Sequence, residues 1–178
     1  MSIFQKVSCS FILMLFYINV YAEEVKMYSD TRPSAEEMGD FLFSSSPQES
    51  SGIKMRSIKF VTHKQNPALG LPIKFGFDSD QILVESKPLV DEIGRMLNLP
   101  SFANNKLVIE GHTDAKGSEK YNRLLSKRRA IAVKNYLMEN YDIASNKLFV
   151  TGMGETQPLS GVTPYSSTNR RVQFRQAP

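Results

Sequence analysis

Cysteine is almost absent from this chain: Cys9 is the only one among 178 residues. It lies within an N-terminal stretch that we expect to be removed, so the mature chain is predicted to have neither a disulfide nor a thiol nucleophile. A lipid-attachment cysteine follows an apolar run and small residues. Cys9 instead precedes the apolar run, which argues against a lipid-modified N-terminus.

Histidine is nearly as scarce, with only His63 and His112. Glu110, His112 and Asp114 alternate along an expected strand and invite a metal or acid–base site. One distant second histidine and no paired-histidine helix motif argue against a metal, and His112 is expected to be a hydrogen-bonded structural residue. No Gly-x-Ser-x-Gly elbow of a serine hydrolase occurs. The sequence therefore predicts no enzyme, no catalytic residue, no metal and no cofactor.

Long apolar runs are missing after the N-terminus. Residues 1–22 resemble a secretory signal, with Lys6 before an apolar stretch from Val7 to Tyr17 and Val20-Tyr21-Ala22 at the cleavage position. The alternative is a retained membrane anchor, but the run is shorter than the roughly 20 residues that a spanning helix needs. We expect cleavage after Ala22 and no membrane span in the mature chain.

Charge of one sign is not strongly in excess. Loss of residues 1–22 lowers Lys+Arg from 22 to 21 against 18 Asp+Glu, so the net charge falls from +4 to +3. This mild positive charge suits an anionic polymer as partner. No basic stripe interleaved with aromatic residues is present, so nucleic acid is not expected as a partner.

Residues 23 to about 52 have the composition of a linker, with Pro33, Pro47 and serine-rich runs. Phe41, Leu42 and Phe43 are the exception; they could dock on the domain, dock on a partner or form a local cluster. Alternation over residues 55–61 predicts a short strand. We therefore divide the mature chain into an attachment segment, residues 23–68, and a domain, residues 69–178.

Regular patterns begin near Leu71. They predict strands at 71–77, 107–109, 148–150 and 172–175, a helix over 83–97 and a second helix from Ser118 to about Asn140. Pro88 favours either a helix start near Pro88 or a break after Ser86. We predict an α/β two-layer sandwich, in which a mixed β-sheet (βαβαβ plus a final strand) carries two main helices on one face.

The candidate site lies between the second strand and the second helix. Asp114 ends the strand, and Arg129 follows fifteen residues later. Asn122, Ser126 and Arg129 lie along one stripe of the helix because they are spaced i, i+4 and i+7. A ligand carrying an ammonium and a carboxylate could be held between Asp114 and Arg129. Two alternatives remain: the stripe is a solvated helix face, or Asp114 and Arg129 form a salt bridge with each other.

Several motifs together resemble the OmpA-like C-terminal domain over about residues 69–175. They are Leu71-Pro72-Ile73 with Phe77-Asp78-Ser79, Gly111-His112-Thr113-Asp114, Gly117-Ser118, Tyr121-Asn122, Leu125-Ser126, Arg129-Ala130, Val133, Gly152-Met153-Gly154-Glu155 with Pro158, and Asn169-Arg170-Arg171-Val172. The resemblance implies that the domain binds peptidoglycan through the diaminopimelate of its stem peptide. It does not extend to residues 23–52.

The same resemblance implies roles for individual residues. Asp114 would pair with the ammonium of diaminopimelate and Arg129 with its carboxylate, an interaction that a guanidinium makes well. Asn122 would add a hydrogen bond, and Arg170 would help from the entrance to the last strand. Asp80 would line the same rim, where the family often has a neutral polar residue.

The resemblance also implies a periplasmic, outer-membrane-associated protein of a Gram-negative envelope. Such a protein would anchor an envelope component to the wall without catalysis. Its partners would be peptidoglycan and, through residues 23–68, outer-membrane or envelope-complex proteins. The alternative function is a structural subunit of an envelope-spanning secretion or motor complex, in which wall binding is secondary.

Overall fold

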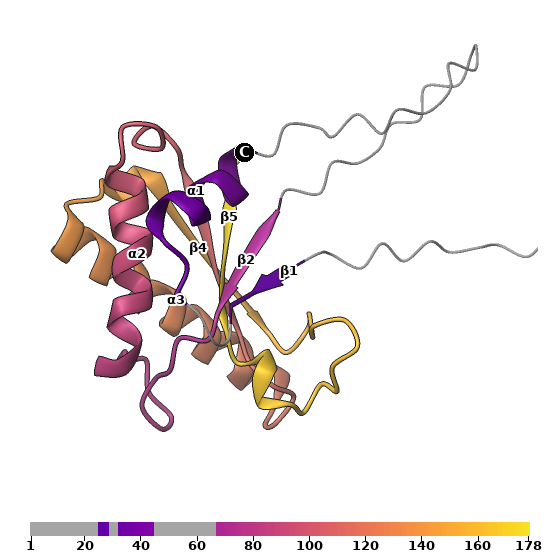
Figure 1. The fold of residues 1–178 in the computed structure, drawn as a ribbon. Helices are drawn as coiled ribbons and strands as arrows, with labels where there is room; N and C mark the ends of the chain where they lie inside the picture. The colour runs from indigo at the N-terminus through magenta and orange to yellow at the C-terminus, as the bar shows by residue number, and fades with distance from the viewer. Residues whose placement is uncertain (1–24, 29–31, 45–66) are drawn as a thin grey trace, which may run out of the picture.

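A five-stranded mixed β-sheet with helices packed on it forms the fold (Figure 1). The computed structural model describes residues 25–28, 32–44 and 67–178. Its strands are β1 (Val25–Met27), β2 (Ala68–Leu71), β3 (Leu107–His112), β4 (Leu148–Gly154) and β5 (Val172–Gln176). Its helices are α1 (Ala35–Phe43), α2 (Lys87–Asn98) and α3 (Glu119–Tyr141), with short 3-10 turns at Val84–Ser86, Ser145–Lys147 and Ser167–Asn169. The predicted α/β fold class is confirmed.

The strands lie in the order β1-β2-β5-β3-β4. β3 and β4 are parallel neighbours joined by α3, as a strand–helix–strand connection favours. β2 and β3 also point the same way, but they are not neighbours. The last strand, β5, lies between them and is antiparallel to both. The C-terminal strand is therefore the centre of the sheet.

Strand register separates an apolar face from a polar face. Phe174 of β5 is paired with Leu69 of β2 on one side and with Ile109 of β3 on the other. These three side chains are fully buried and belong to the core. Successive side chains in a strand point to opposite faces, so Gln173 and Glu110 lie together on the other face.

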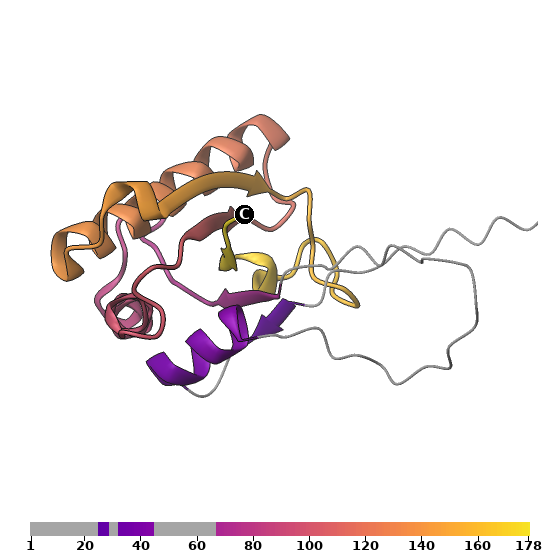
Figure 2. The ribbon, with the colours of Figure 1, turned by 90° about the horizontal axis from the view of Figure 1, so that it is seen from above.

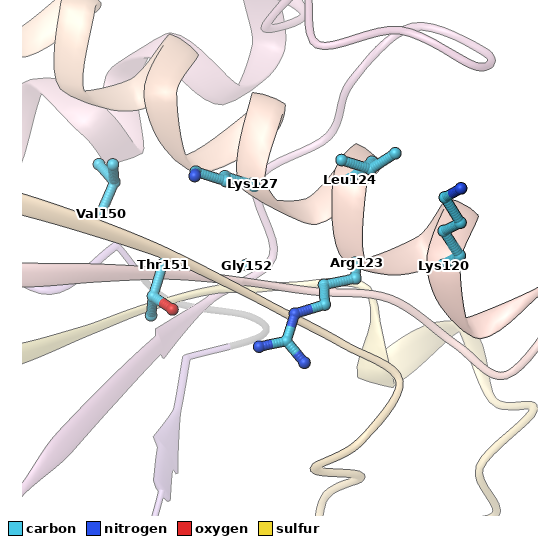
Figure 3. A pocket seen from close by; sticks show the side chains of 7 residues that line it. All are labelled: Lys120, Arg123, Leu124, Lys127, Val150, Thr151 and Gly152. Carbon is cyan, nitrogen blue, oxygen red and sulfur yellow. The ribbon is translucent and has the colours of Figure 1, made fainter.

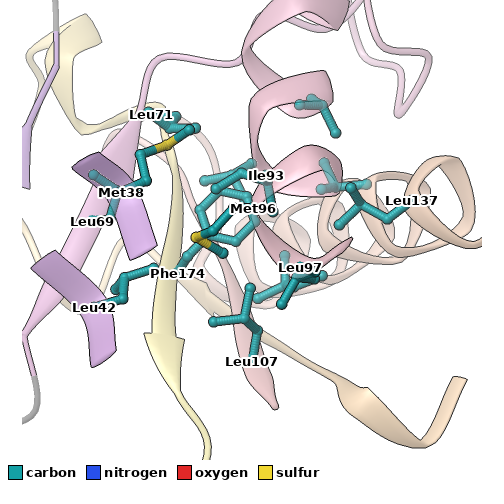
Figure 4. Close-up of a cluster of buried hydrophobic side chains, with 14 of the residues drawn as sticks. Met38, Leu42, Leu69, Leu71, Ile93, Met96, Leu97, Leu107, Leu137 and Phe174 are labelled. Carbon is teal, nitrogen blue, oxygen red and sulfur yellow. The ribbon is translucent and has the colours of Figure 1, made fainter. Parts of the chain in front are cut away.

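The core lies between the sheet and the helices (Figures 2 and 4). Side chains from all three helices meet the same face of the sheet: Met38 and Leu42 from α1, Ile93, Met96 and Leu97 from α2, and Val133 and Leu137 from α3. Each large apolar side chain buried in this way contributes roughly 1.5–3 kcal/mol. The prediction of two helices on one face is confirmed for α2 and α3, and α1 adds a third.

The linker predicted for residues 23 to about 52 is wrong where the structure describes this segment. Val25–Met27 forms β1, which pairs in parallel with β2. Ser34 caps α1 by accepting a hydrogen bond from the Glu37 N–H at 3.2 Å. Met38 and Leu42 are buried in the core, so this part of the chain docks on the domain. The predicted signal at 1–22 and the strand at 55–61 lie outside the described residues.

The first predicted strand is displaced. The structure has β2 at Ala68–Leu71, whereas residues 73–77 leave the sheet and contribute only a bridge between Phe75 and Ile82. Phe77 is wholly exposed, and Asp78 has a left-handed backbone with φ 47°. The alternation of apolar residues here therefore reflects a loop beside the pocket described below rather than a strand.

The helix boundaries follow local signals in the sequence. α2 begins at Lys87 with Pro88 in its first turn, which confirms the start near Pro88. α3 is capped by Ser118, whose hydroxyl accepts from the Tyr121 N–H at 3.3 Å. Within the described residues, no helix combines the length and the apolar character that crossing a membrane requires.

Candidate functional site

A pocket of about 430 Å³ opens at the end of the sheet where β3 runs into its following loop. Three segments line it: the loop after β2 with Phe75 and Asp78, the end of β3 with Thr113 and Asp114, and the first half of α3. Arg170, just before β5, completes the rim. The loops that build it gather at one end of the molecule in Figure 1. Segments distant in sequence therefore form a single pocket.

Asp114 is the buried carboxylate of this pocket, with 6 % of its surface exposed. Its Oδ2 accepts a hydrogen bond from Arg170 Nη1 at 2.6 Å, and the two form a salt bridge. The Arg170 side chain is about half exposed, so it covers the carboxylate from the solvent side. A cationic group of a ligand could bind the Asp114 carboxylate in two ways. It could bind beside the Arg170 guanidinium, or it could displace that guanidinium.

Arg129 reaches the same pocket from α3 but has different partners. Its Nε donates to the Ser79 carbonyl at 3.1 Å, and its guanidinium lies 5.0 Å from the centre of the Phe75 ring. In the described residues, no carboxylate lies within salt-bridge distance of Arg129. The predicted alternative of an Asp114–Arg129 salt bridge is therefore wrong. Burial, foremost among several causes, lowers the pKa of Arg129, because its charge is poorly hydrated.

Asn122 positions the loop that carries Asp114. Its Nδ2 donates to the backbone carbonyls of Asp114 at 3.3 Å and Lys116 at 3.0 Å, and also to the Glu155 carboxylate. The residue is buried, with 2 % of its surface exposed. Its side-chain nitrogen is thus committed to holding together the loops after β3 and β4.

Asp80 does not line the pocket; it is exposed. The acid that the β2–α2 loop contributes is Asp78, whose carboxylate accepts a hydrogen bond from the Tyr121 hydroxyl. This hydrogen bond is the main cause of the raised pKa of Tyr121. The sequence analysis assigns no site role to Asp78, Tyr121 or Phe75, and it places Phe75 in a predicted strand rather than in a loop beside the pocket.

Thr113 also faces this pocket, and its Oγ1 is buried without a hydrogen-bond partner in the described part of the chain. A buried hydroxyl without a partner is costly. Its hydroxyl is not accessible from the pocket, so we expect Thr113 to shape the pocket rather than to contact a ligand.

Glu110 and His112 do not join Asp114. Both lie on the sheet face away from the helices, where Glu110 accepts hydrogen bonds from Gln173 at 3.1 Å and Arg175 at 2.8 Å. Neither ring nitrogen of His112 has a hydrogen-bond partner among the described residues. The prediction that the His112 side chain is hydrogen-bonded is therefore wrong. Its Nε2 lies 3.9 Å from the Glu110 carboxylate, a distance too long for a hydrogen bond. No metal-ligand cluster occurs in the described segments.

Comparison with known proteins identifies a common domain. Outer membrane porin F of Pseudomonas aeruginosa is 30% identical over 105 residues, which cover 58% of this chain and 29% of porin F. Outer membrane protein A of Klebsiella aerogenes is 34% identical over 91 residues, or 51% of this chain and 26% of that protein. The chain thus spans under a third of the length of these relatives.

Solved structures share the fold. The OmpA-like domain of FopA1 from Francisella tularensis matches with a TM-score of 0.52 and 21% identity, covering 62% of this chain and 75% of that one. A putative MotB-like protein from Desulfovibrio vulgaris matches with a TM-score of 0.51 and 22% identity, over 62% and 74% of the two chains. The model of the OmpA family matches residues 74–171, which are more than half of the chain and include every residue that lines the pocket, so this chain belongs to the OmpA family.

Proposed function

We propose that this protein binds cell-wall peptidoglycan without catalysis, through the diaminopimelate of the stem peptide. Domains of the OmpA family are non-enzymatic and generally bind peptidoglycan. Diaminopimelate ends in a carbon that carries both an ammonium and a carboxylate. A receptor for it needs an anion and a cation a short distance apart, in a pocket open to a polymer.

The observation that carries this proposal is the different state of the two arginines. Arg170 neutralises Asp114, whereas Arg129 has no carboxylate partner among the described residues. The ligand carboxylate would supply that partner, because a guanidinium and a carboxylate form a charge-assisted pair. The ligand ammonium would bind Asp114 beside Arg170.

In the proposal, Asn122 contributes by holding the Asp114 loop rather than through its side-chain nitrogen, which already has acceptors. The exported chain would lie in the periplasm and anchor an envelope component to the wall. Residues 69–178 would form the binding domain. β1 and α1 of the preceding segment pack on that domain.

Sedimentation with purified sacculi tests the proposal. The chain should co-sediment with diaminopimelate-containing sacculi and release no muropeptides. Sacculi whose stem peptides carry lysine in place of diaminopimelate are the matched control, because lysine retains the ammonium and lacks the adjoining carboxylate. Retention on the first and loss from the second is the expected result.

Other outcomes would point elsewhere. Equal retention on both sacculi would refute recognition of diaminopimelate. Retention on neither would favour the alternative, a structural subunit of an envelope complex. Release of muropeptides would indicate a hydrolase and refute the non-catalytic assignment.

A further inference from the structure

A second groove lies on the opposite side of α3 from the pocket, along the outer edge of β4 (Figure 3). Lys120, Arg123 and Lys127 line it from the helix, and Val150, Thr151 and Gly152 line it from the strand. None of these residues lines the pocket around Asp114. The groove is therefore separate from the site assigned above.

Tight packing of α3 on β4 creates this arrangement. A Cβ at Gly152 would lie 2.7 Å from the Lys127 backbone nitrogen, so only glycine lets the helix approach the strand so closely. The close approach brings the basic side chains to the edge of β4. In Figure 3, Arg123 extends from the helix across the strand beside Thr151.

The three cations are exposed, and none forms an ion pair with a carboxylate in the described residues. Leu124 and Val150 add apolar surface to the groove, and 56% of the Leu124 surface is exposed. β4 is the last strand of the sheet on this side, so its outer edge presents backbone donors and acceptors without a strand partner in the described part of the chain. The groove thus combines positive charge, apolar contact and a strand edge.

We propose that this groove binds an extended acidic segment of a partner protein, which adds as a strand to the edge of β4. The strand edge supplies main-chain hydrogen bonds, and Lys120, Arg123 and Lys127 select acidic side chains. A second copy of this chain is a poorer occupant, because two such edges would bring six like charges together. The apolar side chains and the strand edge also favour a peptide over an anionic polysaccharide.

Calorimetric titration of the exported chain with synthetic peptides tests this inference. The probe is a short capped peptide that alternates Glu with Val. Two matched probes separate the contribution of charge from that of main-chain hydrogen bonds. One probe replaces Glu by Lys, and the other keeps Glu but carries N-methyl groups that remove backbone donors. The acidic probe should bind, more weakly as salt rises, and both matched probes should bind at least about tenfold more weakly.

The protein variants are Lys120→Glu and Arg123→Glu, with Lys106→Glu as an exposed control outside the groove. Each groove variant should weaken the acidic probe about tenfold, roughly 1.4 kcal/mol, and the control should not. Retention on sacculi should be unchanged in all three, which separates this inference from the proposed wall binding.

Three results would overturn it. Equal binding of the acidic and N-methylated probes would mean that charge alone acts, without strand addition. Groove variants that aggregate but bind the probe normally would mean that the basic residues only protect the edge from self-pairing. Dimers of the wild-type chain that form through β4, with no probe binding, would assign the edge to a second copy.

Discussion

Arg170 and Arg129 divide two tasks between them in the pocket. Arg170 pairs with Asp114 at 2.6 Å, so the buried carboxylate is neutralised without a ligand. Arg129 contacts the Ser79 carbonyl and the Phe75 ring and has no ion pair to lose in the described structure. Changes at Arg129 should therefore affect ligand binding more than stability.

We predict that Asp114→Asn and Arg129→Ala each weaken binding to a diaminopimelate-containing muropeptide while the fold persists. Truncating one member of a buried charged pair costs about 2–5 kcal/mol, and this part-solvated rim should give the lower end. About 2 kcal/mol corresponds to a factor near 30 in affinity. Calorimetric titration measures the affinity, and a melting curve measures stability.

Arg128→Ala is the matched control for Arg129→Ala, because Arg128 is the adjacent exposed arginine and does not line the pocket. It should bind normally. Unchanged affinity in well-folded Asp114→Asn and Arg129→Ala would remove the proposed site. Affinity that falls only in step with the melting temperature would indicate a structural role.

His112 is the second residue with a measurable consequence. Burial, partly opposed by Glu110, lowers its pKa below the ordinary 6.5, and the nearby Arg171 lowers it further. The unfolded chain therefore binds a proton more readily than the folded chain. The contribution of neutral His112 to stability is present above about pH 6.5 and is lost as the pH falls toward the folded-state pKa.

We predict that the free energy of unfolding decreases between pH 7.5 and pH 5, and that His112→Gln makes this decrease smaller. Urea unfolding at several pH values measures both slopes. His112→Gln can shift stability at every pH, so the difference in slope is the readout. An identical pH slope in the two proteins would show that folding does not lower the pKa of His112.

At the scale of single elements, α1 and β1 make part of the N-terminal segment a component of the folded domain. α1 contributes Met38 and Leu42 to the core, and Gly39 lies so close to Phe102 that a Cβ there would overlap the ring. Tyr28 follows β1 and donates a hydrogen bond to the Glu37 carboxylate at 2.7 Å. These elements therefore belong to the folded unit.

We predict that Met38→Ala lowers the free energy of unfolding by about 2–5 kcal/mol, because it leaves a cavity in a fully buried site. Glu36→Gln, on the exposed side of the same helix, is the control and should change stability by less than about 1 kcal/mol. Chemical denaturation of both variants measures the difference. Equal stability of the two would mean that α1 does not pack on the domain in solution.

At the scale of the whole molecule, β1 begins at Val25, just after the predicted cleavage position at Ala22. Cleavage there would leave every described element in the mature chain. We predict that periplasmic protein begins near Glu23 and carries no lipid, which intact mass spectrometry measures. A mass that retains Met1, or one with acyl chains on Cys9, would contradict the prediction.

Much of the fold was predictable from the sequence because its signals are local. Apolar periodicity predicted β3, α3, β4 and β5 to within a few residues, and Ser118 marked the start of α3. The motif around Gly111 to Arg129 pointed to the correct end of the sheet, where Asp114 and Arg129 do line one pocket.

The tertiary structure decided what depends on contacts between distant segments. β5 inserts between β2 and β3, and Arg170 thereby reaches Asp114 across 56 residues of sequence. The loop with Phe75 and Asp78 alternates like a strand but leaves the sheet. A short helix such as α1 has little stability by itself and is stabilised by the surface on which it packs. Its position therefore depends on tertiary contacts that the local sequence does not encode.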